Sequence, residues 1–167
     1  MRIPATARLL IPLAVAFHAS AADVGADFSG SYTLTNSKGG SKAKTGDTQT
    51  LRVSQTESAV EIIKIINGVP NANKFPLDGP DGPYVSPGGV KGVGRARFKG
   101  KTLVIETLIT TRPQANAPEV RIDTKERWNL SADSKKLTIR TDVDFPNSLL
   151  DGGIQLIKPW TETYARD

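Results

Sequence analysis

Short runs in which apolar and polar residues alternate, separated by turn residues, dominate the chain from Asp27 onward. Such alternation is typical of β-strands with one buried face, because successive side chains point to opposite sides of a sheet. It predicts strands over residues 28–35, 49–55, 59–66, 93–98, 102–111, 120–130, 137–145 and 161–166. After the first 22 residues, no stretch shows a sustained 3.6-residue apolar period, so a βαβ organisation is excluded.

The connections between these runs are short enough to be hairpins. Gly100 lies between two runs, and residues 131–135 and 55–59 join two further pairs with Ser, Asp and Thr. Consecutive strands joined in this way lie antiparallel. Eight to ten of them leave two exposed edges unless the sheet closes on itself. The sequence therefore predicts an all-β, antiparallel up-and-down β-barrel; a two-sheet β-sandwich is the alternative.

One region interrupts the alternation. Residues 67–92 carry five prolines and six glycines, with one short strand expected over residues 74–77. Proline removes a backbone donor and is rare in central strands, so this region is interpreted as a long loop. A loop of this length is either a lid over the barrel mouth, with Tyr84 as its apolar tip, or a structural crossover without ligand contact.

The first residues have the pattern of a cleaved signal peptide. Two basic residues, Arg2 and Arg8, precede an apolar run over residues 9–17, and small residues follow at 19–21. The run is too short to span a bilayer as a helix. We expect a signal peptide over residues 1–21 and a mature single domain over residues 22–167, located in a periplasm or outside the cell. A buried N-terminal helix is the alternative.

The composition excludes several kinds of chemistry. The single histidine is His18, within the expected signal peptide, and the chain has no cysteine. A mature chain without imidazole or thiol has no Ser-His-Asp or Cys-His catalysis and no zinc or haem site built on these ligands. No catalytic residue, metal site or cofactor is therefore predicted.

The charge distribution does not favour binding to nucleic acid. The net charge is +5 and falls by two when Arg2 and Arg8 are removed. The charges are interspersed, and the local tract of Lys38, Lys42 and Lys44 lies among glycines, as in a solvated loop. No later run is long and apolar enough to be a membrane span.

The first strand resembles the Gly-x-Trp opening of the lipocalin or calycin group. Gly30 matches the glycine, and Tyr32 stands in the place of the tryptophan. The resemblance implies that this aromatic ring closes one end of the barrel and packs against a basic side chain of the last strand. Arg166 is the residue in the corresponding position, and a guanidinium over an aromatic face is attractive.

Several segments are also similar to a family of small exported bacterial proteins of unknown function. The similar phrases are Phe28-Ser-Gly-Ser-Tyr32, residues 96–107, residues 126–139 and Tyr164-Ala-Arg166. The resemblance covers most of the mature chain. It implies a lipocalin-like barrel and export, and it leaves the activity open because fold does not imply function.

Alternation also indicates which charged residues share a face with apolar ones. Glu126 lies in phase with Trp128, Arg95 with Arg97, and Glu106 has apolar neighbours on its own face. A buried Glu126 needs a partner, which Arg95, Arg97 or Lys64 could supply. The candidate ligand-binding residues are Tyr84, Arg95, Arg97, Glu106, Glu126 and Trp128. The same charges could instead face solvent or form structural ion pairs.

Three functions are consistent with this pattern. The first is a binding protein that holds a small apolar or amphipathic molecule in the barrel. The second is a protein-interaction or inhibitor module with a filled barrel. The third is an isomerase- or cyclase-like enzyme, which needs two ionisable groups, such as Glu106 and Glu126, to converge in a pocket. Binding without catalysis is the expectation.

Overall fold

The computed structural model describes residues 25–39, 48–112, 114–146 and 157–167, so the expected signal peptide and the tract at Lys42 and Lys44 lie outside the described residues. Ten strands make up the described chain. They are β1 (Gly30–Gly39), β2 (Gln49–Gln55), β3 (Ala59–Ile66), β4 (Val69–Pro76), β5 (Gly82–Val85), β6 (Lys91–Lys99), β7 (Thr102–Thr111), β8 (Val120–Leu130), β9 (Lys136–Asp144) and β10 (Trp160–Arg166).

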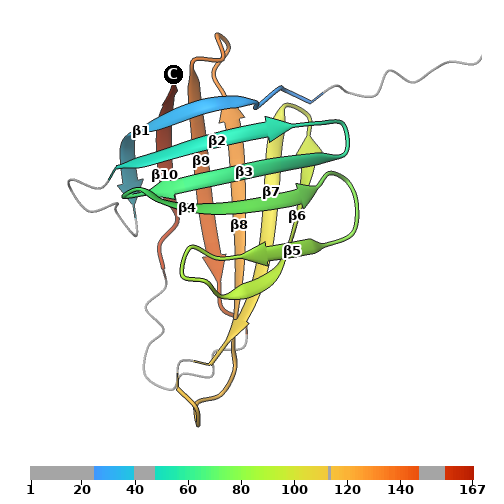
Figure 1. Ribbon diagram of the computed structural model, residues 1–167, viewed down its shortest axis with the longest axis vertical. Helices are drawn as coiled ribbons and strands as arrows, with labels where there is room; N and C mark the ends of the chain where they lie inside the picture. Colours follow the sequence, from blue (N-terminus) through green and yellow to red (C-terminus); the bar gives the residue numbers. More distant parts are fainter. Residues whose placement is uncertain (1–24, 40–47, 113, 147–156) are drawn as a thin grey trace, which may run out of the picture.

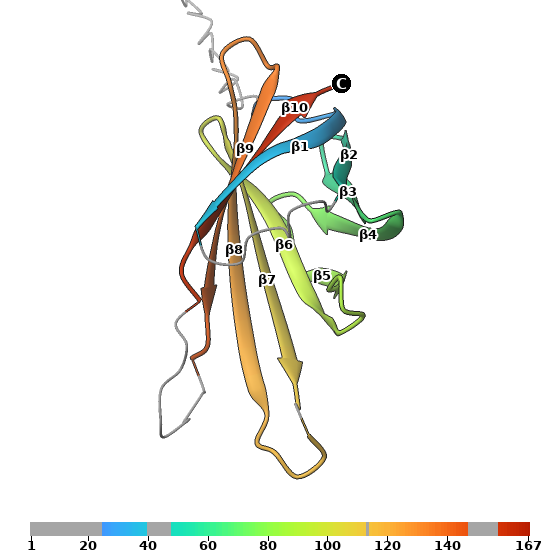
Figure 2. The ribbon, with the colours of Figure 1, turned by 90° about the vertical axis from the view of Figure 1, so that its left-hand side faces the viewer.

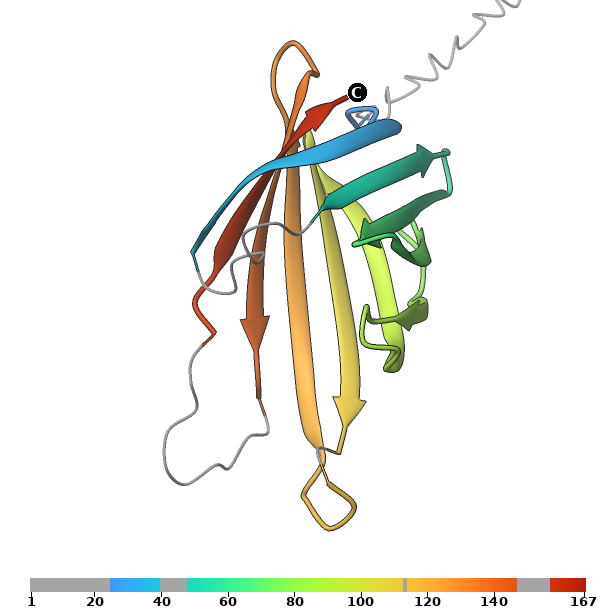
Figure 3. The same cartoon turned by 60° about the vertical axis from the view of Figure 1, so that its left-hand side comes forward.

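The strands form one antiparallel sheet in the order β4-β3-β2-β1-β10-β9-β8-β7-β6-β5. Apart from β4 and β5, which stand at the two ends of this order, consecutive strands are paired, and β1 also pairs with β10, so the sheet curls into a nearly closed barrel. The predicted up-and-down barrel is confirmed. Figure 1 shows β1–β4 running across β6–β10. In Figures 2 and 3 the lower ends of β7 and β8 extend beyond the part of the barrel that β1–β4 cover.

The boundary between β4 and β5, here called the seam, has no backbone ladder and is bridged by side chains. Asn73 accepts a hydrogen bond from the Val85 amide at 2.8 Å and donates one to the Val85 carbonyl at 3.0 Å. Asn71 donates to the same carbonyl at 3.1 Å. Two short amide side chains therefore take the place of a ladder along this line.

The prediction of a long loop over residues 67–92 was wrong, because β4 and β5 lie within it. Asn67 and Gly68 adopt φ values of 50° and 82° and make a tight hairpin turn between β3 and β4. Pro70 and Pro76 lie in β4, and Pro83 lies in β5. Each of these strands has a ladder on one side only, so a proline without an N–H is tolerated there.

Arg166 closes the barrel at the end where β1 and β10 meet. Its guanidinium carbon lies 5.3 Å from the centre of the fully buried Tyr32 ring. It donates hydrogen bonds to the carbonyl oxygens of Ser29 and Ser134. A Cβ on Gly30 would come within 2.9 Å of the Arg166 Nε atom, so a glycine gives the guanidinium room to lie here. This is the arrangement that the resemblance to lipocalins implies.

The core fills the barrel just below this closed end. The Phe28 ring packs edge-on against Trp128, with ring centres 6.4 Å apart, and Tyr32 donates its hydroxyl to the Phe28 carbonyl at 2.8 Å. Further buried side chains come from the inner faces of β2, β3, β7 and β9, including Leu51, Val60, Leu103 and Leu137. The inner faces are apolar near the closed end and become more polar along the barrel.

Candidate functional site

A cavity of about 240 Å³ lies inside the barrel, below the packed core. One part of its wall is apolar and is formed by Leu51, Ile62, Phe75, Ile105, Trp128 and Ile139. The other part is polar and is formed by Lys64, Asn71, Asn73, Tyr84, Thr107, Thr124, Glu126 and Thr141. An apolar pocket with a few polar groups is the usual form of a small-molecule site, although this volume lies just below the common range of about 300–1,000 Å³.

Four inner-face side chains form a polar network beside the cavity. Lys64 Nζ on β3 lies 3.5 Å from Glu162 Oε2 on β10. Tyr164 donates its hydroxyl to Glu162 at 3.0 Å, and the Gln49 amide bonds Glu162 at 3.4 Å and also contacts Tyr164. Burial raises the pKa of Tyr164, and the neighbouring Glu162 adds to this effect. The phenol therefore remains a hydrogen-bond donor to the carboxylate.

Glu126 on β8 is the carboxylate that lines the cavity itself. Its Oε2 accepts a hydrogen bond from the Trp128 indole at 2.8 Å. Burial raises the pKa of Glu126, and the charge of Glu162 acts in the same direction. The Lys64 charge and the Trp128 hydrogen bond oppose this shift without cancelling it. The side chain is half-buried and lines the cavity.

Tyr84 enters the barrel from β5, where a loop tip was expected. Its ring packs against Phe75, with centres 6.0 Å apart, and lines the cavity. Burial raises the pKa of Tyr84 to about 12, and the charge of Glu126 contributes to the shift. Tyr84 is therefore a neutral phenol on the same side of the cavity as the seam.

The other candidate charges, Arg95, Arg97 and Glu106, point away from the cavity. They lie on the outer faces of β6 and β7, and Arg95 is directly opposite Glu106 in the register of these two strands. Glu106 makes ion pairs with Arg95 at 3.2 Å, with Arg97 at 2.9 Å and with Lys125 at 2.9 Å. Desolvation alone would raise the pKa of Glu106, but hydrogen bonds from Lys125 and Arg95 outweigh it, and the pKa is lowered.

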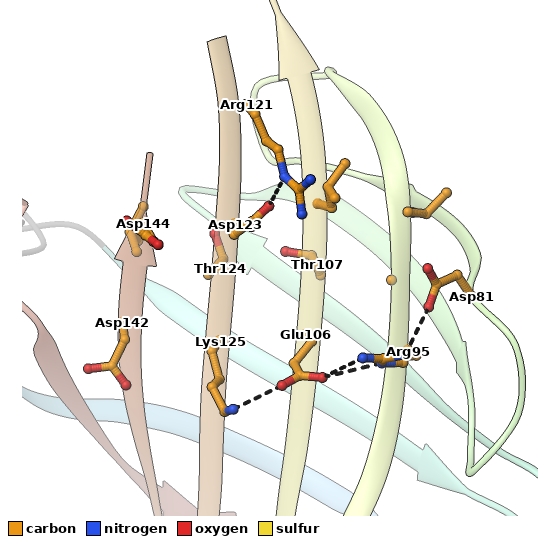
Figure 4. Close-up of a pocket in the computed structure, with 14 residues that line it drawn as sticks. Asp81, Arg95, Glu106, Thr107, Arg121, Asp123, Thr124, Lys125, Asp142 and Asp144 are labelled. Carbon is orange, nitrogen blue, oxygen red and sulfur yellow. Dashed lines mark hydrogen bonds and ion pairs between the residues drawn. The ribbon is translucent and has the colours of Figure 1, made fainter. Parts of the chain in front are cut away.

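Arg95, Glu106 and Lys125 border a second depression of about 480 Å³, here called the outer hollow. Figure 4 shows Glu106 between Lys125 and Arg95, with Asp81 next to Arg95. Charges of both signs alternate around it, including Arg121, Asp123, Asp142 and Asp144. Most of these charges are already in ion pairs, among them Glu106 with Arg95 and Lys125, and Arg121 with Asp123, so the outer hollow offers less to a ligand than the interior cavity does.

The structure therefore separates the six predicted site residues into two groups. Tyr84, Glu126 and Trp128 meet at the interior cavity, whereas Arg95 and Glu106 line the outer hollow and Arg97 is paired with Glu106 on the same outer face. Glu106 and Glu126 lie on opposite faces of the barrel wall, so this carboxylate pair does not converge in one pocket.

Among the expected partners for Glu126, Lys64 alone faces the interior, and its closest ion pair is with Glu162. Glu162, Tyr164 and Gln49 were not predicted as site residues. The alternation of β10 places Glu162 and Tyr164 on one face with Arg166, and this signal could have identified them. The described residues contain no cluster suited to a metal ion, and no helix among them is long and apolar enough to cross a membrane.

The described chain is a ten-stranded, antiparallel, up-and-down β-barrel with an interior cavity. No family model matches the sequence, and no match is found among curated proteins. Solved structures do match over 83–84% of this chain. The REP1-NXSQ fatty acid transporter is 12% identical, with 95% of its chain covered and a TM-score of 0.58.

Two further structures give the same result. Fatty-acid-binding protein 1 of Echinococcus granulosus is 13% identical, with 96% of its chain covered and a TM-score of 0.58. The zebrafish ileal bile acid-binding protein complexed with cholic acid is 15% identical, with 98% covered and a TM-score of 0.59. At these identities the likeness establishes the shared fold.

Proposed function

We propose that this protein binds a small amphipathic molecule inside its barrel, without catalysing a reaction. The observation that carries the proposal is the interior cavity, whose wall is apolar on one side and has a few polar groups on the other. A filled barrel would leave no such space. The matched solved structures include proteins described as a fatty acid transporter and as bile acid-binding, which supports a ligand of this class.

A paired substitution tests whether a ligand enters the barrel. Thr141 lines the interior cavity and is not among the residues around the outer hollow, whereas Leu108 lines the outer hollow and is not among the residues around the cavity. In a titration with the neutral fluorescent probe Nile red, we expect Thr141→Phe to weaken binding about tenfold or more, because the ring occupies the cavity. Leu108→Phe is expected to bind the probe as the unmodified protein does.

Circular dichroism checks that both variants keep the β-rich fold. A loss of probe binding in Leu108→Phe with normal binding in Thr141→Phe would place the ligand at the outer hollow. Absence of Nile red binding by the unmodified protein would count against the proposed function as a whole.

We also propose that the protein works outside the cytoplasm. This proposal is supported by the basic and apolar pattern of residues 1–21. The N-terminal sequence of protein recovered from its own host tests it, and a mature chain that begins at Ala22 or Asp23 is the expected result.

A further inference from the structure

The charged groups on the inner face of the described barrel wall are unequal in sign. Glu126 and Lys64 line the cavity, and Glu162 lies directly beside Lys64. Arg166 belongs to the closed end, where Tyr32 separates it from this space and backbone carbonyls accept its hydrogen bonds. The cavity is therefore bordered by two carboxylates and one ammonium group.

The ammonium group of Lys64 is already engaged. It lies 3.5 Å from Glu162, and the same carboxylate accepts hydrogen bonds from Tyr164 and Gln49. Glu162 is 6% exposed, so removing its cation would leave a buried charge without a counter-ion. Lys64 and Glu162 thus balance each other, and Glu126 remains as the unbalanced charge.

Glu126 has one oxygen available to a ligand. The Trp128 indole occupies Oε2, and the other oxygen forms no hydrogen bond with a described residue. Its neighbours in register are Ile105 on β7 and Thr141 on β9, both of which also line the cavity. A half-buried carboxylate that has a single hydrogen bond gains most from a partner that brings a positive charge.

We propose, on the basis of the proposed function, that the interior cavity takes an amphipathic amine whose protonated head group binds Glu126. A ligand carboxylate would bring a third negative charge beside Glu126 and Glu162 and would compete with Glu162 for Lys64. Fatty acids and bile acids are carboxylic acids. The chain therefore shares its fold with the matched structures and differs in the charge of its preferred ligand.

Three ligands with the same eight-carbon chain test the proposal: octylamine, octanoate and octanol. Isothermal titration calorimetry at pH 7.5 is expected to show octylamine binding about tenfold or more tightly than octanoate, with octanol between them. If octanoate binds as tightly as octylamine, the amine preference is wrong and the barrel remains a binding protein. If none of the three binds, and Nile red does not bind either, the proposed function itself fails.

Two matched carboxylate substitutions separate a local contact from a general charge effect. Glu126→Gln is expected to weaken octylamine binding about tenfold and to leave octanol binding unchanged, because the amide cannot supply a negative charge. Glu61→Gln removes the same charge from an exposed position on the outer face of β3 and should change neither affinity. Equal losses in the two variants would overturn the assignment to Glu126.

The unmodified protein provides a second measurement that does not depend on a variant folding. Octylamine binding should weaken as the pH falls from 7.5 to 4.5, since Glu126 gains a proton while the ligand stays cationic. The titratable groups that face Glu126 are Lys64 on β3, Tyr84 on β5, and Glu162 and Tyr164 on β10. A pH dependence of the same size in Glu126→Gln would contradict the proposal.

Discussion

Glu126 lies among apolar and aromatic residues, where the loss of hydration makes its charged form less favourable than in water. Because its pKa is raised in the folded state, the unfolded chain loses this proton first as the pH rises. Ionisation of Glu126 therefore lowers the free energy of unfolding as the pH rises from the pKa of this residue in the unfolded chain to its pKa in the folded protein. Below both pKa values the carboxyl is neutral in both states and has no such effect. Glu106 has the opposite shift, and its contribution to stability is present above its unfolded pKa and is lost in acid.

The shift of Glu126 predicts a pH-dependent stability change on substitution. We expect Glu126→Gln to raise the urea midpoint at pH 7.5 and to leave it nearly unchanged at pH 3.5, where the carboxyl is neutral in both states. Urea denaturation followed by tryptophan fluorescence measures both midpoints. Glu61→Gln serves as the exposed control with no expected change at either pH, and a lower midpoint for Glu126→Gln at pH 7.5 would refute the account.

For much of the barrel, the residues that share a face of a strand could be predicted from the sequence, because side chains alternate between the two faces with a period of two. That pattern placed Glu126 with Trp128 on one face and Arg95 with Arg97 on another, and the structure has these same groupings. Which face points inward depends on the neighbouring strands. Arg95 and Arg97 face outward because Gly94 and Ala96 fill the inside of β6, where Phe75 lies too close for a larger side chain at position 94.

The seam is the element whose nature was hardest to predict. The prolines in β4 and β5 indicated a loop. Proline is tolerated in these two strands because each of them forms a backbone ladder on one side only. The Asn67-Gly68 pair is a strong hairpin signal and could have shown that β4 follows β3 directly. No local pattern indicates that Asn71 and Asn73 bond to Val85, since this contact depends on the curvature of the whole sheet.

The side-chain hydrogen bonds at the seam predict how easily β4 and β5 separate. Asn73→Ala removes two hydrogen bonds to Val85 and should lower the free energy of unfolding by about 1–2 kcal/mol. Hydrogen exchange should show faster exchange at the Val85 amide, with protection in β7 and β8 largely kept. The control Asn129→Ala, at an exposed position where Thr102 donates to the side chain, should cost less than about 0.5 kcal/mol.

At the scale of the whole molecule, the ten described strands begin at Gly30, well after the expected signal peptide. We therefore expect the barrel to form without residues 1–21. Expression of the full chain in a bacterium should give a periplasmic product whose mass matches a start at Ala22 or Asp23. A variant that lacks residues 1–21 should stay in the cytoplasm and give the same β-rich circular dichroism spectrum. Retention of residues 1–21 in the recovered protein would contradict the export proposal.

The wall of this barrel can change its circumference at one place more easily than at any other. Nine of the boundaries between neighbouring strands are backbone ladders, whereas the remaining one is spanned by the Asn71 and Asn73 side chains and by the contact between the Phe75 and Tyr84 rings. Widening along that line would break these side-chain contacts and leave the nine ladders intact. We therefore expect the interior to accommodate a guest larger than the present space, with Tyr84 moving outward together with β5.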